Sequence, residues 1–303
     1  MAESAALREA ILALKEERDA VILAHNYQVP GVQDIADIVG DSLELARAAA
    51  SLDHTTIVFC GVDFMAETAA ILSPEKTVLL PASDACCPMA DMVTAGELGL
   101  LRSRYPDAAV VAYVNTTAEV KAASDICCTS ANAVKVVQSI PQDQVIFVPD
   151  RNLARYVARF TGKEIHPWDG YCIVHEQFSL ADVMYQRRRH PSAEILVHPE
   201  CRPEVIDSAD HVFSTSGMIR HACQSRAEEF IIGTETGILH QLFRTCPEKR
   251  CFPLSPRAIC VNMKKTSLVK LHAALDCMAP RIVVPEDIAV PARRAIERML
   301  AIP

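Results

Sequence analysis

An internal repeat restricts the possible folds of this chain more than any other feature of its sequence. A unit of about 86 residues occurs three times. Its first segment is apolar in each copy: VILAHNY (21–27), VVAYVN (110–115) and ILVHPE (195–200). An aspartate and then a hydroxyl residue follow each segment at the same spacing: Asp37 and Ser42, Asp125 and Ser130, Asp210 and Thr215. This register, kept without gaps in three places, indicates three copies of one structural unit.

Each copy alternates apolar segments with helical patterns. The second apolar segments are followed by Asp63, Asp150 and Glu235, and the third end at Pro81, Pro167 and Pro253. A cysteine comes after each proline, and helical patterns near 89–104, 178–189 and 266–277 come next. Strands that alternate with helices predict a parallel sheet covered on both faces.

We therefore expect an α/β protein of three homologous three-layer αβα repeats with parallel sheets, arranged about a pseudo-threefold axis. The expected bounds are 1–105 with an N-terminal helix, 106–191, and 192–303 with a C-terminal tail that includes a helix at 291–301.

Polar side chains gather at the predicted carboxyl ends of the first strands. Each strand has a pair of them two residues apart: His25 and Tyr27, Tyr113 and Asn115, His198 and Glu200. Functional loops of parallel sheets lie beyond the carboxyl ends of the strands, so the three pairs are expected to share one face and meet near the axis. The alternative is that these side chains only cap strand ends through hydrogen bonds.

Three of the twelve cysteines, Cys87, Cys172 and Cys260, occupy the same place in the repeat. Three convergent thiolates suit a zinc site with His175 as a possible fourth ligand. They equally suit a [4Fe–4S] cluster that leaves one iron open as a Lewis acid. A third interpretation is that they are core residues copied by duplication.

Composition excludes several classes of protein. Half of the 303 residues are hydrophobic and the net charge is −8, which fits a folded protein and argues against nucleic acid as a partner. Residues 1–20 predict a charged amphipathic helix rather than a signal peptide, and no apolar run approaches the roughly 20 residues of a membrane span. We therefore expect a cytoplasmic protein without membrane contact, whose thiols do not form disulfides.

The repeated hydroxyl residues Ser42, Ser130 and Thr215 each precede a helical pattern and are expected near helix N-caps. Helix N-termini offer free N–H groups and a partial positive charge, so three of them can form an anion site without lysine. Plain capping is the alternative. Lys264 and Lys265 can add positive potential to this site, although lysines that precede a helix are more often solvated.

Long motifs through roughly residues 20–270 resemble one known family. They are HNYQVP, DACCPMADM, YVNTTAEVKAASDICCTSANA, WDGYCIVHE, HPEC, STSGM, TETGILH and CVNMKKTSL. Together they are similar to the quinolinate synthase family. The resemblance implies three homologous domains about a pseudo-threefold axis and one [4Fe–4S] cluster with three cysteine ligands and one open iron. It also implies condensation of iminoaspartate with dihydroxyacetone phosphate to give quinolinate, phosphate and water in NAD biosynthesis.

The same resemblance assigns roles to residues. The cluster ligands are Cys87, Cys172 and Cys260, with Cys87 preferred to its neighbour Cys86 because of the Met-Ala-Asp that follows. Proton transfers fall to Tyr27, Glu200, His25, His198 and Tyr113, with Glu200 as the expected base. Substrate binding adds Ser42, Asn115, Ser130, His175, Ser214 and Thr215. The implied partners are the two small substrates and an aspartate-oxidising enzyme. An iron–sulfur carrier or sensor and a structural zinc protein remain alternatives from other classes.

Overall fold

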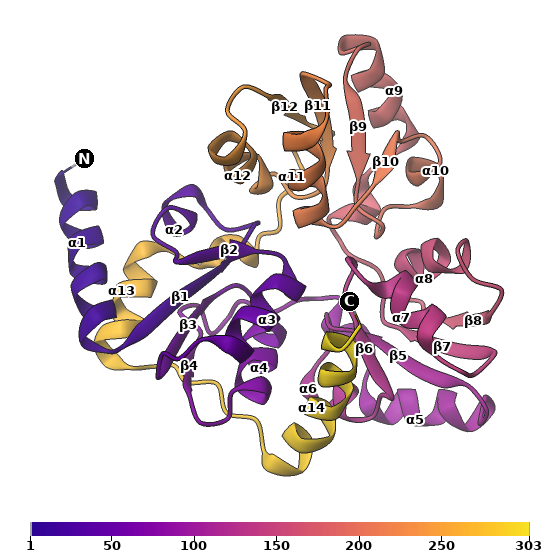
Figure 1. Cartoon of the computed structure of the whole chain (residues 1–303), viewed down its shortest axis with the longest axis horizontal. Coiled ribbons are helices and arrows are strands. Elements are labelled where there is room, and N and C mark those ends of the chain that lie inside the picture. Colours follow the sequence, from indigo (N-terminus) through magenta and orange to yellow (C-terminus); the bar gives the residue numbers. More distant parts are fainter. Residues whose placement is uncertain (1, 303) are drawn as a thin grey trace.

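Three four-stranded parallel sheets form the framework of the protein, one from each sequence repeat. The structure is a computed structural model that describes residues 2–302. The strand orders are β2-β1-β3-β4, β6-β5-β7-β8 and β10-β9-β11-β12, so one topology occurs three times. Figure 1 shows the three units around a common centre. The predicted fold class is confirmed.

The elements of each unit follow the same order. The first unit contains α1 (Ala2–Glu17), β1 (Ala20–His25), α2 (Pro30–Gln33), β2 (Ile38–Gly40), α3 (Ser42–Ser51), β3 (Thr56–Cys60), α4 (Asp63–Leu72), β4 (Thr77–Leu79) and α5 (Ala95–Arg104). The second contains β5 (Ala109–Tyr113), α6 (Ala118–Ala122), β6 (Ile126–Cys128), α7 (Ala133–Ser139), β7 (Gln144–Val148), α8 (Arg151–Ala158), β8 (Glu164–Pro167) and α9 (Leu180–Arg189). The third contains β9 (Glu194–Val197), α10 (Pro203–Ile206), β10 (His211–Val212), α11 (Thr215–Gln224), β11 (Glu229–Gly233), α12 (Ile238–Thr245) and β12 (Arg250–Pro253), and α13 (Leu268–Cys277) and α14 (Glu286–Leu300) follow.

Central strands are buried along their length, as their apolar sequences require. Every residue of β1 and β5 is buried, because helices cover both faces of a parallel sheet. The short edge strands β2, β6 and β10 were not expected from the sequence. They have only three, three and two residues, which is too short for periodicity to reveal them.

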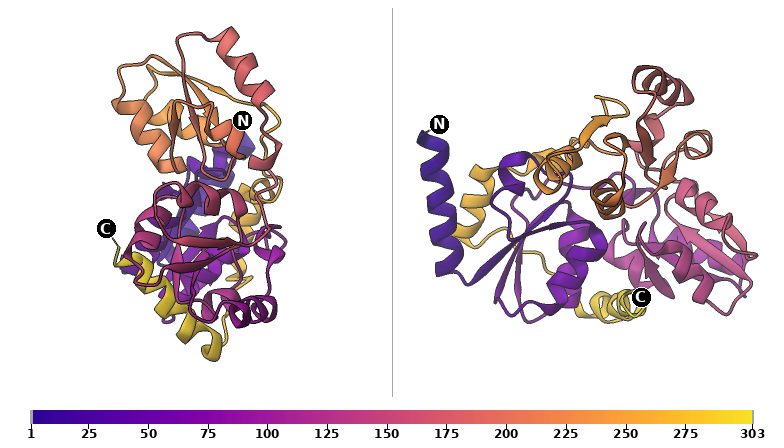
Figure 2. Two further views of the ribbon diagram at one scale, coloured as in Figure 1. Left: turned by 90° about the vertical axis from the view of Figure 1, so that its right-hand side faces the viewer. Right: turned by 45° about the horizontal axis from the view of Figure 1, so that its top comes forward.

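The two C-terminal helices pack mainly on the first and second units. α13 lies beside α1 and contacts β3 of the first sheet, while α14 packs against α6 and β6 of the second (Figures 1 and 2). The helix expected at 291–301 is therefore present, but it begins earlier, at Glu286. The predicted repeat bounds stay a prediction.

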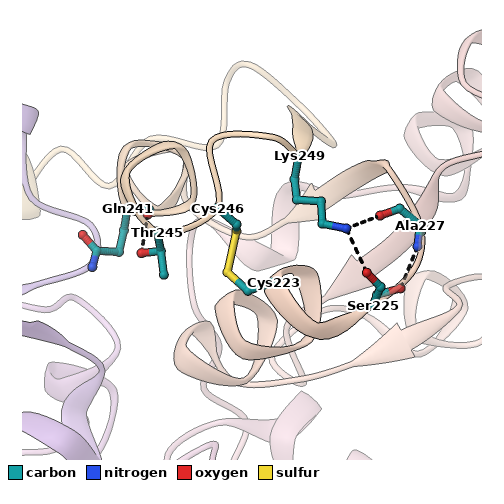
Figure 3. The surroundings of a disulfide bond; sticks show 7 residues. All are labelled: Cys223, Ser225, Ala227, Gln241, Thr245, Cys246 and Lys249. Atoms are coloured by element: carbon teal, nitrogen blue, oxygen red, sulfur yellow. Dashed lines mark hydrogen bonds between the residues drawn. A yellow bond between two sulfur atoms is a disulfide. The ribbon is translucent and has the colours of Figure 1, made fainter.

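One expectation about the cysteines is wrong. A disulfide joins Cys223 of α11 to Cys246, the residue that ends α12, with the two Cα atoms 5.5 Å apart (Figure 3). The expectation of free thiols came from the reducing environment of the predicted compartment. This disulfide depends instead on the packing of α11 against α12, which brings the two cysteines together.

Within residues 2–302, no helix has the length and apolar character that crossing a membrane requires.

Candidate functional site

Residues from all three units line one cavity at the carboxyl ends of the central strands. Thirteen of the fourteen residues expected to react, bind substrate or hold a cluster are among the lining residues: His25, Tyr27, Ser42, Cys87, Tyr113, Asn115, Ser130, Cys172, His175, His198, Glu200, Thr215 and Cys260. The three cysteines are therefore neighbours in space. Ser214 does not line this cavity, because its hydroxyl turns to Asp41. Cys86 does not line it either.

A turn after each central strand orients the polar pairs. β1 ends at His25, so Tyr27 lies in the turn rather than on the strand, and its backbone N–H donates to His25 Nδ1 at 3.2 Å. An Nδ1 that accepts leaves the proton of a neutral imidazole on Nε2. Burial lowers the pKa of His25 to about 4, which keeps the ring neutral.

Glu200 lies between two histidines and is almost completely buried. Its Oε2 is 2.6 Å from His175 Nδ1 and 3.4 Å from His198 Nδ1. Burial by itself raises the pKa of Glu200, but His198 and His175 outweigh it and hold the pKa well below its usual range. Glu200 is thus a buried carboxylate, and its other oxygen, Oε1, has no hydrogen-bond partner among the described residues.

Thr234 completes a chain of polar contacts that the sequence analysis missed. Its hydroxyl is 2.5 Å from the Tyr27 hydroxyl and 2.8 Å from His175 Nε2. Burial lowers the pKa of His175, so a neutral ring can accept from Thr234 while its Nδ1 side faces Glu200. Thr234 directly follows β11, and the position of the other polar residues just after strands was the signal that could have identified it.

Two tyrosines add protonated phenols to the cavity. Burial, reinforced by the charge of Glu200, raises the pKa of both Tyr27 and Tyr113 well above the usual value. The cavity therefore places the ionised carboxylate of Glu200, which can accept a proton, beside two phenols that can donate one.

Each of the three cysteines is held by an acidic residue of its own unit. The backbone N–H of Cys172 donates to Asp150 and that of Cys260 donates to Glu235, both at 3.2 Å. The N–H of Cys87 hydrogen-bonds to Asp63 in the same way. These acids are the ones that follow the second predicted strand of each repeat. The hydrogen bond that fixes each cysteine loop is therefore present in all three copies.

Burial raises the pKa of all three thiols. The cysteines are thus not reactive nucleophiles by themselves, and a bound metal is what makes such thiols thiolates. Another possible donor set, Cys172 with His175 and Glu200, has its ligand atoms within 4.8 Å of one another. In this set His175 Nδ1 is 2.6 Å from Glu200, and its Nε2 contacts Thr234.

Lys264 differs from the expectation of a solvated lysine. Its ammonium group lies 2.9 Å from Glu235 and donates to the backbone oxygen of Tyr27 at 2.5 Å. Its side chain is only 23% exposed. Lys264 therefore connects Glu235 of the third unit to Tyr27 of the first, beside the cavity. Its positive charge also offsets that of the buried Glu235 carboxylate.

The hydroxyl residues lie at the cavity but are not the N-caps. Asp41 caps α3 and Ser214 caps α11, so Ser42 and Thr215 are the first helical residues, and α7 begins three residues after Ser130. Asp41 accepts from two N–H groups of α3, which reduces the attraction of this helix end for an anion. Hydrogen bonds orient two of the hydroxyls: Asn26 donates to Thr215 and His198 contacts Ser130, both at 3.1 Å.

Comparison with known proteins gives a consistent result along the whole chain. The family model described as "Quinolinate synthetase A protein" matches residues 9–301. The protein named quinolinate synthase from Methanoregula boonei is 66% identical over 302 residues, with 100% of each chain covered. Quinolinate synthase from Geotalea uraniireducens is 54% identical over 297 residues, 98% of each chain. Quinolinate synthase 1 from Methanosarcina acetivorans is 54% identical over 300 residues, 99% of each chain.

Proposed function

Because this chain belongs to the quinolinate synthetase A family, we propose that it condenses iminoaspartate with dihydroxyacetone phosphate to form quinolinate for NAD biosynthesis. The products besides quinolinate are phosphate and water. The observation that supports this most is the cavity itself, where three thiols, the buried carboxylate of Glu200 and two phenols are brought together from different repeats. An electron carrier needs no such set of acids and bases.

The three cysteines fit a [4Fe–4S] cluster with three thiolate ligands. They come from equivalent loops, line one cavity, and have no fourth cysteine beside them among the described lining residues. When bound, such a cluster supplies an iron with an open position, a Lewis acid for the loss of hydroxide from carbon. The carboxylates of Asp63, Asp150 and Glu235 orient the loops that would hold it.

The proton transfers fall to side chains with fixed protonation states. Glu200 is the base, since it is ionised and its Oε1 has no partner among the described residues. Tyr27 is the acid, because its phenol stays protonated and reaches His175 through Thr234. Thr234 contacts both Tyr27 and His175, so it fixes the position of the Tyr27 phenol beside the Glu200–His175 pair.

Substrate anions and hydroxyls have their own partners. The neutral His25 presents its Nε2–H, and Ser42, Ser130 and Thr215 present hydroxyls, to carboxylate or phosphate oxygens. The buried Oδ1 of Asn115 has no partner among the described residues, so it can accept from a substrate amine or hydroxyl. Iminoaspartate is the product of oxidising aspartate, and we expect functional coupling to an enzyme that does so.

An anaerobic assay tests the proposal. Purified protein receives iminoaspartate generated in place and dihydroxyacetone phosphate, and quinolinate is measured together with bound iron and zinc. Quinolinate formation that scales with iron content supports the proposal. Zinc in place of iron, together with no quinolinate from fully metallated protein, would contradict it and favour a structural zinc site.

A further inference from the structure

We propose that Glu194, His211 and His221 form a second metal site, for Zn²⁺, at the N-terminal edge of the third sheet. Glu194 Oε2 lies 2.7 Å from His221 Nε2 and 3.9 Å from His211 Nε2. The three ligand atoms are all within 4.8 Å of one another. This edge is at the opposite end of the strands from the catalytic cavity, so the site is independent of the proposed reaction.

Rigid elements present the three side chains. Glu194 and His211 are the first residues of the neighbouring strands β9 and β10, and His221 is in the last turns of α11. The ring of His221 packs against those of His211 and Phe213, with centroids 4.3 and 5.1 Å apart. Ser225 donates to Glu194 at 3.2 Å, which orients the carboxylate as an outer partner of a metal ligand does.

Comparison with the other two repeats shows that these polar residues are not required by the fold. The positions equivalent to Glu194, His211, His221 and Ser225 are Ala109, Ile126, Val136 and Ile140 in the second repeat, and Val21, Ile38, Ala48 and Leu52 in the first. The last of these positions ends the helix in all three repeats, which supports the alignment. The third repeat has therefore replaced an apolar contact between helix and sheet with two imidazoles, a carboxylate and a hydroxyl.

The donor set selects the class of ion. Two imidazole nitrogens and one carboxylate oxygen with an open fourth position suit tetrahedral Zn²⁺, whereas Mg²⁺ and Ca²⁺ prefer oxygen ligands. Ligands at about 2.1 Å from a tetrahedral ion are about 3.4 Å apart. The two measured distances lie on either side of this value, so small side-chain rotations close the site. The side chains of His211 and His221 are 40% and 24% exposed, which gives an ion and a water ligand access from solvent.

A bound ion would connect the last turns of α11 to both strands. The same helix begins with Thr215, which lines the catalytic cavity. An ion that binds only the folded protein raises its unfolding temperature as the free ion concentration rises above the Kd. The expected role is therefore to stabilise the third unit.

The test uses the full chain with its iron–sulfur cluster loaded, because empty Cys87, Cys172 and Cys260 would also bind zinc. Zn²⁺ is titrated anaerobically by calorimetry, with Mg²⁺ as the comparison ion, and anomalous diffraction at the zinc edge locates the bound ion. We expect one zinc peak between Glu194, His211 and His221, and an unfolding temperature that rises with Zn²⁺ but not with Mg²⁺. His211→Ala and His221→Ala should each weaken binding by at least about tenfold.

The matched control is His240→Ala. His240 also pairs with a carboxylate, Asp34, at 2.7 Å, but no second histidine belongs to that pair. Zinc affinity should be unchanged in this variant, and quinolinate formation should be unchanged in His211→Ala, whose side chain is the most exposed of the three. A zinc peak only at cysteine sulfurs, no binding at all, or an unchanged affinity in His211→Ala would each overturn the proposal.

Discussion

The two ends of the three sheets have diverged to different extents. At the N-terminal edge, one contact recurs in every unit: an aspartate accepts at 2.8 Å from a backbone N–H of the central strand and pairs with a cation of the preceding helix. The aspartates are Asp37, Asp125 and Asp210, the N–H groups belong to Ile22, Val110 and Ile195, and the cations are Lys15, Arg102 and Arg187.

At the C-terminal edge the cysteines, the acids that hold their loops and the hydroxyl residues recur in every unit. The polar pairs at the ends of the first strands differ from unit to unit: a histidine and a tyrosine, a tyrosine and an asparagine, a histidine and a glutamate. A reaction needs acids and bases with different pKa values, and identical residues around an axis cannot provide them. The N-terminal edge thus preserves the fold, while the C-terminal edge carries the chemistry.

The strongest test of this contrast removes a ligand at the C-terminal edge. Cys172→Ser should abolish both quinolinate formation and the brown colour expected of a bound [4Fe–4S] cluster, because a hydroxyl does not replace a thiolate as an iron ligand. Cys251→Ser, in β12, is the matched control and should keep both. Iron content and visible absorbance, measured anaerobically, report the result. A variant of Cys172 with full iron would show that this thiol is not a ligand.

The next largest effect is expected at Glu200. Glu200→Gln preserves shape but removes the base, so kcat should fall by about 10²- to 10⁴-fold while iron content stays at the wild-type level. Glu176→Gln, a less buried acid of the same region, should have a much smaller effect. Steady-state kinetics with both substrates measure this. Equal losses in the two variants would mean that Glu200 acts through local structure only.

Acid sensitivity should arise at the C-terminal edge. The pKa of His25 is lowered from 6.5 to about 4 in the folded protein, so the unfolded chain binds the proton more tightly between these values. Stability is therefore complete above about pH 6.5 and falls as the pH drops towards 4, by on the order of 3 kcal/mol from this residue. His25→Asn keeps an acceptor for the Tyr27 N–H but cannot be protonated, so its denaturation midpoint should change less over this range. The same slope in both proteins would exclude His25 as the cause.

A smaller effect is expected from the acids that hold the cysteine loops. Asp150→Ala removes the acceptor of the Cys172 N–H and should speed iron loss to a chelator by about tenfold, whereas Asp150→Asn retains an accepting oxygen and should lose less. Asp210→Ala, at the N-terminal edge of the neighbouring unit, should not change the rate of iron loss. If Asp150→Ala and Asp210→Ala release iron equally fast, the acids act on general stability and not on the cysteine loops.

Regular features of the repeat could be predicted from sequence, and features that depend on contacts between units could not. The spacing of His25, Tyr113 and His198 located three strand ends that share one cavity, because duplication preserves register. The repeat could not predict the contacts of Lys264, whose partners lie in two different units. It also did not reveal Thr234, because this residue does not belong to the polar pairs that recur after the first strand of each unit. The prediction that Ser42 and Thr215 lie near helix N-caps is confirmed, since each directly follows the N-cap residue, Asp41 or Ser214.

The disulfide was unpredictable for a related reason. Cys223 and Cys246 have no common phase in the repeat, and only the packing of α11 on α12 brings them together. Short edge strands such as β10 depend in the same way on the neighbouring strand and on the aspartate before them, as shown by the hydrogen bond from Ile195 to Asp210. Local patterns therefore predicted the units, whereas tertiary contacts determined the details between them.

The weakest effect is expected from the repeated ion pairs of the N-terminal edge. Arg102→Ala removes the cation that pairs with Asp125. Both side chains are more than a third exposed and water screens the pair, so the free energy of unfolding should fall by less than about 1 kcal/mol. Lys15→Ala should cost more than Arg102→Ala, because Lys15 is only 20% exposed and lies 2.6 Å from Asp37. Both costs should shrink at high salt, since exposed charges are screened. Denaturant unfolding at low and high ionic strength measures the difference. A loss of several kcal/mol, or any loss of iron, in Arg102→Ala would mean that the two edges of the sheet are coupled and that the division between fold and chemistry is not as sharp as the repeat suggests.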